Sequence, residues 1–270
     1  MSDISSLPAA VRQNVQDFAR RIEVWQGVPG DIRSKFWETD SDDPYFHSAS
    51  EMVQFTTANC EAGNSFLRST LVSEFKEKLE ADLRRSQVSP PEDRDLGWLT
   101  SEYLVWIDRL FFFGLITQPA KCSGGLRATR SAIALEVDGK VREGKENLQK
   151  GHFNEQTGGL LIRLRQCSGE WHPLEMIICI AAHELTHAYL HLLTRDQSAS
   201  RYWRQVQQNH GHGEEFWLLL HFIQSRLLDI APEMHILRDQ IIQDTYKGLQ
   251  QAASEPEVSD EAARALIHPS

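Results

Sequence analysis

The stretch EWHPLEMIICIAAHELTHAYLHLL, which ends at Leu193, constrains the fold of this chain more than any other feature. Its aliphatic side chains are numerous enough to cover most faces of a helix, so such a helix has to lie inside a protein core. Pro173 suits the first position of a helix, and Glu175 falls in the first turn, where a carboxylate interacts favourably with the helix dipole. The stretch therefore predicts a long, mostly buried helix that begins near Pro173.

Three polar residues interrupt this apolar pattern at the spacing of a metal site. His183 and His187 lie four residues apart, so on a helix their imidazoles leave the same face about 6 Å apart along the axis. Glu184 is turned by about 100° from His183, which places its carboxylate beside an ion held by the two histidines. Two histidines and an acid in this arrangement predict zinc-assisted hydrolysis of peptide bonds, with Glu184 as the general base.

A catalytic zinc ion usually has three protein ligands, so a third must come from elsewhere in the chain. His191 continues the four-residue spacing, but on a straight helix it lies about 12 Å from His183 and is expected to be a surface histidine. The extended motif of the metzincins is absent, because Leu190 and Leu193 occupy the positions of its glycine and its third histidine. The third ligand is therefore expected outside this helix.

The downstream segment NHGHGEEF offers the candidates for that third ligand. His212 stands between two glycines, which allow the chain to bend beneath the helix, and this favours His212 over His210. A carboxylate from Glu214 or Glu215 is the alternative, as in zinc enzymes with two histidines and a glutamate. The predicted zinc ligands are thus the two helix histidines and His212. Directly afterwards, EEFWLLLHFIQSRLLDI predicts another strongly apolar helix.

Hydrophobic periodicity and helix breakers divide the chain into three regions. Residues 1–90 are predicted to be a helical N-terminal region, with one amphipathic helix over 8–25 and more helix over 50–87. The segment SPPEDRDLG closes this region, since prolines and a charge run interrupt regular structure. A metalloprotease domain is expected over 91–235, and a C-terminal helical tail over 236–270.

The middle region is expected to combine helices with a small sheet. Residues 111–113, all phenylalanine, fit the buried end of a helix, and Gly114 offers a stop signal. Alternating aliphatic and polar residues predict strands within 126–141 and 158–166, while the segment 142–159 between them is predicted to be a loop. These elements predict an α+β fold in which a few-stranded sheet packs on the helix that carries the histidines.

Charge and cysteine content narrow the classes of partner and compartment. The formal net charge of −10 argues against a protein that coats nucleic acid by bulk electrostatics. The segment 121–165 is a local exception, because its nine basic and five acidic residues give a net charge of +4. The start MSDISSLPAAVRQ lacks the basic-then-apolar order of a signal peptide, so an intracellular protein with no membrane partner is expected. No CxxC spacing occurs, which predicts free thiols at Cys60, Cys122, Cys167 and Cys179.

Three segments together resemble the SprT-like metalloproteases, a family that includes the Spartan-type proteases. They are YLVWIDRLFFFGLIT at 103–117, IAAHELTHAYL at 180–190 and GHGEEF at 211–216, and the likeness extends over about 98–230. The resemblance implies a small α+β zincin-like core, zinc as the cofactor, and Glu184 as the general base. It also implies cleavage of proteins crosslinked to DNA, stimulated by DNA, and a nuclear location.

The chain departs from that family in features that leave other functions open. The segment between His187 and His212 is longer than usual, and no C-terminal CxxC ribbon is present. A zinc-stabilised scaffold that recruits partners through its N-terminal helices is one alternative, and a general intracellular peptidase acting on short peptides is another. The first expectation is a zinc endopeptidase of the SprT-like type that cleaves protein substrates, including proteins bound to DNA.

Overall fold

The structure is a computed structural model of the 270-residue chain. The structural statements below concern the residues that it describes, which fall in seven ranges: 48–60, 65–88, 93–117, 133–140, 150–154, 157–194 and 212–254. The amphipathic helix predicted over 8–25 lies outside these ranges, as do parts of each of the three predicted regions.

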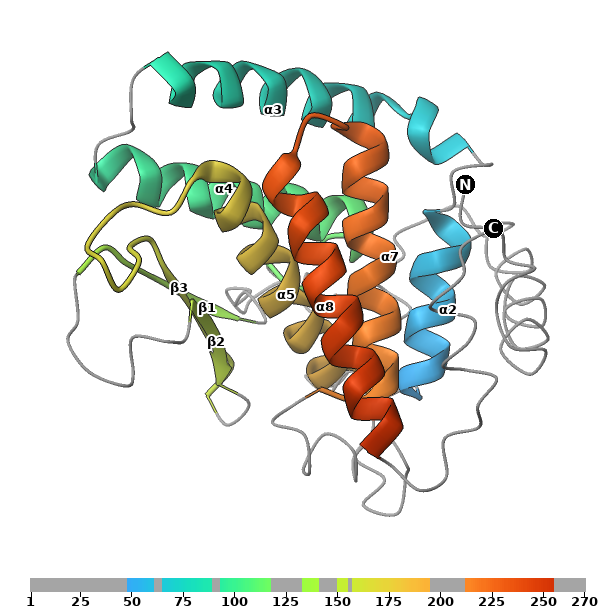
Figure 1. The fold of residues 1–270 in the computed structure, drawn as a ribbon. Coiled ribbons are helices and arrows are strands. Elements are labelled where there is room, and N and C mark those ends of the chain that lie inside the picture. Colours follow the sequence, from blue (N-terminus) through green and yellow to red (C-terminus); the bar gives the residue numbers. More distant parts are fainter. Residues whose placement is uncertain are drawn as a thin grey trace, which may run out of the picture.

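Six α-helices, one short 3-10 helix and a three-stranded sheet form the described part of the chain (Figure 1). The helices are α2 (Ala49–Asn59), α3 (Thr70–Val88), α4 (Asp93–Phe111), α5 (Leu174–Leu193), α7 (Glu214–Ile230) and α8 (His235–Ser254), and the 3-10 helix is η3 (Ser65–Arg68). The strands are β1 (Ala134–Asp138), β2 (Gly151–Asn154) and β3 (Gly159–Arg163). The predicted α+β class is confirmed.

Helix α5 lies at the centre of the core, as its composition predicts. It contacts α4, α7, α8 and β2, and Figure 1 shows it between the sheet on one side and α7 and α8 on the other. The helix begins at Leu174, one residue later than predicted, because Pro173 has an extended backbone and occupies the N-cap position. Glu175 falls in the first turn, and its carboxylate accepts a hydrogen bond of 2.8 Å from the backbone N–H of Ile236 at the start of α8.

Within the described residues, α5 is also the one helix that is long and apolar enough to cross a membrane. However, 72% of its most apolar window is buried inside the protein. A helix that is apolar on most faces is equally typical of the core of a globular protein, and here the other elements cover it. We therefore assign α5 to the core.

A tight turn ends α4 and places its aromatic residues. Gly114 has a positive φ of 73°, a conformation that stops a helix and that glycine adopts without strain. The carboxylate of Asp108 accepts hydrogen bonds from the N–H groups of Ile116 at 3.2 Å and Thr117 at 2.8 Å, which fixes the chain after the turn. The phenylalanine run at 111–113 packs into the core. The predicted helix stop is confirmed, as is the burial of Phe111 and Phe112, whereas Phe113 is partly buried against the core.

The sheet has the strand order β1-β3-β2, with β3 in the middle. Strand β1 runs parallel to β3 and pairs Leu135 with Leu160, whereas β2 runs antiparallel and pairs Phe153 with Leu160. Strands β1 and β3 lie within the segments predicted to be strands. Strand β2 lies within 142–159, so the prediction of a loop there was wrong. Its four residues contain one buried aromatic and begin with glycine, which is too short a pattern to show alternation.

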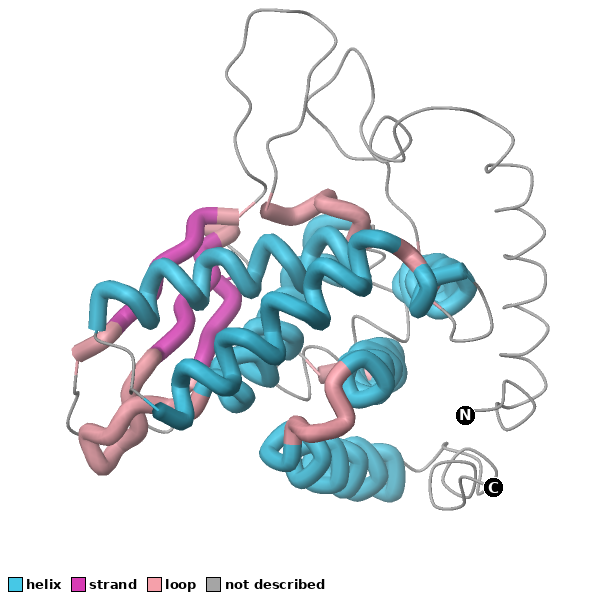
Figure 2. Tube along the Cα trace, turned by 90° about the horizontal axis from the view of Figure 1, so that it is seen from above, coloured by secondary structure: helices cyan, strands magenta, loops and turns pink. Residues whose placement is uncertain are grey.

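Helices α2 and α3 come from the predicted N-terminal region and belong to the same hydrophobic cluster as the rest of the core. Helix α2 contacts α5 and α7, and Figure 2 shows α3 and α4 running side by side. The hydroxyl of Tyr103 on α4 donates to Asp82 on α3 at 3.1 Å, which ties these two helices together. The helices predicted over 50–87 are confirmed in the described residues, while the domain boundaries stay predictions.

Three of the four cysteines are described, and they are free thiols as predicted: Cys60 and Cys179 are buried and Cys167 is exposed. Burial raises the pKa of the Cys179 thiol to about 12, so this side chain is protonated and unreactive at neutral pH. Cys122 lies outside the described residues.

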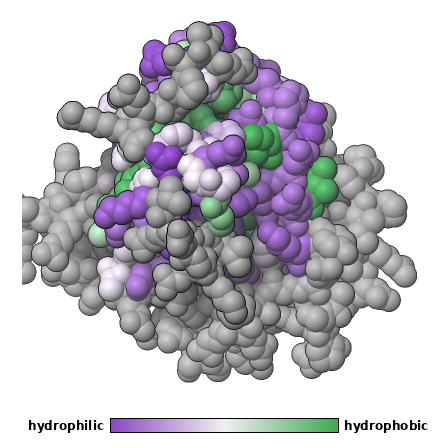
Figure 3. Space-filling view, turned by 60° about the vertical axis from the view of Figure 1, so that its left-hand side comes forward, coloured by the Kyte–Doolittle hydropathy of each residue, from purple (hydrophilic) through white to green (hydrophobic). Residues whose placement is uncertain are grey.

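Few large apolar side chains are exposed on the described surface. Trp98 and Ile242 are the most exposed, and Val105 and Leu135 are about one-third exposed. On the face drawn in Figure 3, the coloured residues are mainly hydrophilic, and hydrophobic ones occur in small separate groups. Scattered apolar residues of this kind are normal on a protein surface and do not indicate a docking site.

Candidate metal centre

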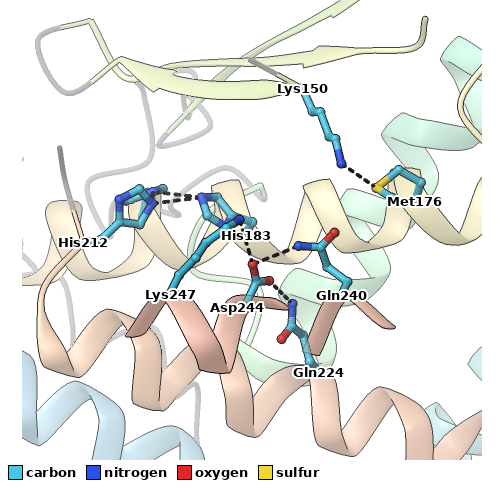
Figure 4. A network of polar contacts seen from close by, with 9 residues as sticks. Lys150, Met176, His183, His212, Gln224, Gln240, Asp244 and Lys247 are labelled. Atoms are coloured by element: carbon cyan, nitrogen blue, oxygen red, sulfur yellow. Dashed lines mark hydrogen bonds and ion pairs between the residues drawn. The ribbon is translucent and has the colours of Figure 1, made fainter. Parts of the chain in front are cut away.

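Three histidines from two separate parts of the chain meet at one point. His183 and His187 lie on successive turns of α5. His212 lies just before α7, and Figure 4 shows its ring beside that of His183. Their Nε2 atoms form a nearly equilateral triangle, with 3.3 Å between His183 and His187 and 3.2 Å from each of these atoms to that of His212. The structure thus brings together the three predicted ligands in a group that can hold a metal ion.

The size of this triangle fits zinc. Zinc binds imidazole nitrogen at about 2.0–2.1 Å, and at that distance nitrogens 3.2–3.3 Å apart subtend about 105°, close to the tetrahedral angle. All three residues are half-buried, so the group is not closed off from solvent. Within the described residues, no other group of three histidine, cysteine or acidic residues converges in this way.

Burial keeps two of these imidazoles neutral, which is the state that binds a metal. Desolvation, followed by the fields of His212 and Lys247, lowers the pKa of His183 to about 3. Desolvation and the neighbouring histidines hold the pKa of His187 well below its usual value. At neutral pH both rings therefore present a nitrogen lone pair without first losing a proton.

Two aromatic residues at the start of α7 support the histidine rings. Phe216 is fully buried and stacks on His187 with 4.2 Å between ring centroids. The same phenylalanine makes an edge contact with His183 at 4.9 Å and with His212 at 4.7 Å. Trp217 stacks on His212 at 5.0 Å. This packing restricts the orientation of all three rings, a role for Phe216 and Trp217 that the sequence did not reveal.

Glu184 lies beside the three-histidine group but is not part of it. The residue is 5% exposed on α5, and its carboxylate is not among the ligand atoms that converge. Burial raises the pKa of Glu184 to about 8, although the backbone N–H of Phe153 in β2, which donates to the carboxylate, acts in the opposite direction. A carboxyl group with a pKa near neutrality is suited to accepting and returning a proton.

Strand β2 approaches Glu184 so closely that glycine is required at its first position. A Cβ atom on Gly151 would lie 2.7 Å from both Cγ and Oε1 of Glu184, and 2.7 Å from Cγ2 of Ile180. Real Cβ atoms essentially never come closer than 3.0 Å to such neighbours. The strand that the sequence did not predict therefore holds the candidate base, through the bare backbone of Gly151 and the N–H of Phe153.

The other candidate ligands lie apart from the group. Glu214 is exposed and Glu215 is half-buried in the first turn of α7, and neither joins the converging atoms. His191 is half-buried, and its ring packs edge-on against Phe153 at 5.6 Å. His191, expected at the helix surface, is thus partly covered, because Phe153 of the unpredicted strand β2 packs against its ring. His210 lies outside the described residues.

One cation of the basic segment 121–165 is engaged within the protein. Arg165 donates hydrogen bonds to the backbone oxygens of Gly139 at 2.9 Å and Gly169 at 2.7 Å. Its guanidinium also lies 3.4 Å from the ring centroid of Trp171. These contacts fix the turn after β3, so Arg165 has an intramolecular structural role.

Comparisons with known proteins do not identify the function of this chain. No protein-family model, no curated protein and no solved structure matches the sequence or the fold. Function therefore has to be inferred from the spacing of HELTH, the triangle of histidine nitrogens and the setting of Glu184.

Proposed function

We propose that the protein is a zinc-dependent endopeptidase of the SprT-like type, in which Glu184 is the general base and three histidines hold the ion. The observation that carries this proposal is the convergence of three Nε2 atoms at 3.2–3.3 Å beside a buried glutamate. Three protein ligands leave the fourth position of a tetrahedral zinc ion for water or substrate, which is typical of catalytic zinc sites. The proposed ligands are His183, His187 and His212.

When bound, zinc supplies Lewis-acid activation of water and of a peptide carbonyl. The chain supplies the proton transfers: Glu184 takes a proton from the attacking water and returns it to the amine nitrogen as the C–N bond breaks. The close approach of Gly151 and the N–H of Phe153 keep the carboxylate in one orientation during both transfers. With a divalent cation held by the three histidines, Glu184 would favour its charged form and could then act as the required base.

The proposed core is zincin-like, with a small sheet packed on the helix that carries two ligands and the base. Helix α5 contacts β2 and β3, and the third ligand follows immediately before α7. The order of motifs, from the phenylalanine run at 111–113 through α5 to His212, supports the SprT-like type. On the same resemblance we propose protein substrates that are bound or crosslinked to DNA.

Cleavage of a purified DNA-binding protein, with and without single-stranded DNA, tests this function. Zinc-loaded wild type is compared with Glu184→Gln, which keeps the size of the side chain and removes the base. We expect a loss of at least about 100-fold in kcat/KM, with unchanged zinc content. Glu214→Gln is the matched control, because this glutamate is exposed and not among the converging atoms, and it should cleave like wild type.

Equal cleavage by wild type and Glu184→Gln would contradict the proposal. Glu184-dependent cleavage that increases when DNA is added supports substrates bound to DNA. Glu184-dependent cleavage that does not change with DNA would exclude DNA-bound substrates and keep the zinc endopeptidase. Protein that binds zinc, cleaves nothing and captures a defined partner would instead be the zinc-stabilised scaffold. Rapid turnover of short peptides without DNA would identify a general peptidase.

A further inference from the structure

Helix α8 brings a cation to the edge of the three-histidine group. The side chain of Lys247 extends from α8 toward His183, and its Nζ lies 3.5 Å from Oδ1 of Asp244, about one turn earlier on the same helix (Figure 4). The field of Lys247 is one of the causes of the low pKa of His183, as expected for a charge close to the ring. The predicted C-terminal tail thus contributes a charged group to the site.

The ion pair with Asp244 does not by itself explain why a lysine occupies position 247. Asp244 is 5% exposed, and it accepts hydrogen bonds from Nε2 of Gln224 at 3.0 Å and from Nε2 of Gln240 at 2.8 Å. Each carboxylate oxygen therefore has an amide donor, and Oδ1 pairs with Lys247 as well. The side chain of Lys247 is 59% exposed, and exposed ion pairs within a helix contribute little to stability.

A positive charge in this place is unfavourable for metal binding alone. An ammonium group near the ligands of a divalent cation repels that cation, and partial exposure weakens the repulsion without removing it. Placing the Lys247 ammonium group near a bound divalent cation becomes favourable when a negative charge lies close to the two cations. Hydrolysis of a peptide bond creates such a charge, on the carbonyl oxygen of the carbon under attack.

We propose that Lys247 is an anion-binding catalytic residue: its ammonium group, oriented by Asp244, stabilises the negative charge on the carbonyl oxygen during peptide hydrolysis. This inference rests on the proposed function. The water oxygen forms a bond to the carbonyl carbon, the π electron pair moves onto the carbonyl oxygen, and the water proton passes to Glu184. When the double bond re-forms, the C–N bond breaks and Glu184 returns the proton to the amine. Lys247 is needed only while the oxygen is charged.

The position of the Lys247 charge can be tested without measuring cleavage. The measured quantity is the zinc affinity of the protein, determined by competition with a chelator. Lys247→Met removes the cation and should raise the affinity about threefold to tenfold. Lys247→Arg keeps the charge and should stay within about twofold of wild type. Lys76→Met is the matched control, since Lys76 on α3 is an exposed lysine in a helical pair with Glu80, and its affinity should be unchanged. Equal affinities in all variants would overturn the inference.

Binding of a peptide phosphonate at saturating zinc tests recognition of the anion. The phosphonate mimics the tetrahedral intermediate of hydrolysis, because its phosphorus is tetrahedral and its oxygens are negatively charged. Lys247→Met should weaken phosphonate binding about tenfold, Lys247→Arg should restore most of it, and Lys76→Met should have no effect. Unchanged phosphonate affinity in Lys247→Met would remove the proposed role.

Kinetics then separate this inference from the proposed function. Lys247→Met should lower kcat about 10-fold to 100-fold with little change in KM, because the contact is made in the transition state. A raised KM with unchanged kcat would contradict the inference. If wild type cleaves nothing, the proposed function fails, and the phosphonate series alone decides whether Lys247 binds an anion at the metal centre.

Discussion

Replacing Gly151 by alanine tests whether β2 positions the candidate base. The new Cβ would meet Glu184 and Ile180 at 2.7 Å, whereas ordinary contacts begin at 3.4 Å, so the strand or the glutamate has to move by roughly 0.7 Å. Overpacking of this kind costs about 1–3 kcal/mol of stability. A displacement close to 1 Å in a catalytic group lowers the rate by up to about 100-fold. None of the three histidines is among the nearest atoms, so zinc binding should persist.

The assay compares Gly151→Ala with Gly139→Ala, whose Cβ would lie at ordinary distances of 3.6 and 3.8 Å from Trp171. We expect Gly151→Ala to keep its zinc, to unfold at a lower temperature and to lose about 10-fold to 100-fold in kcat/KM. Gly139→Ala should resemble wild type in all three measurements. If the two variants cleave and unfold alike, the reasoning about β2 is refuted.

Further predictions concern pH and stability. The pKa of Glu184 is about 8 in the folded metal-free protein and 4.5 when unperturbed, so the folded state binds more protons between these values. Relative to Glu184→Gln, metal-free wild type should therefore lose stability as the pH rises from 4.5 to about 8; a gain would contradict this. Asp108→Asn weakens the acceptor for the N–H groups of Ile116 and Thr117 and should cost about 1–3 kcal/mol in urea unfolding, whereas an unchanged midpoint would exclude this role. Gly97 lies within α4, and a Cβ added there would be no closer than 4.0 Å to its nearest neighbour, Val137. Because alanine favours a helix more than glycine does, Gly97→Ala should stabilise the protein by about 0.5–1 kcal/mol in the same assay. A lower midpoint would contradict this.

The features that the sequence predicted correctly are those encoded over short distances. The apolar pattern and Pro173 located α5, and the four-residue spacing placed His183 and His187 on one face of it. The two glycines around His212 indicated a bend, and the structure places His212 against the same face. Neighbouring residues determine α5 and the spacing of its two histidines, whereas the meeting of His212 with them is a tertiary contact that the bend could only suggest.

The features that were missed depend on contacts between distant segments. Strand β2 has four residues, and its role arises from pairing with β3 and from the close approach of Gly151 to Glu184. Its sequence signal, a glycine before a single buried aromatic, is too weak to distinguish a strand from a loop. Asp244 and Lys247 have the spacing of an ordinary helical surface pair, and only the packing of α8 against α5 brings them to the histidines.

The most direct test of the metal centre is the zinc stoichiometry of the purified protein and its single variants, measured after equilibration with buffered zinc. Wild type, Glu184→Gln and His191→Ala should each bind one zinc ion per chain. Alanine at His183, His187 or His212 should abolish tight binding, because each variant removes one corner of a triangle with sides of 3.2–3.3 Å. A His212→Ala protein that binds one zinc ion as tightly as wild type would contradict the assembly of the site from α5 and the segment before α7.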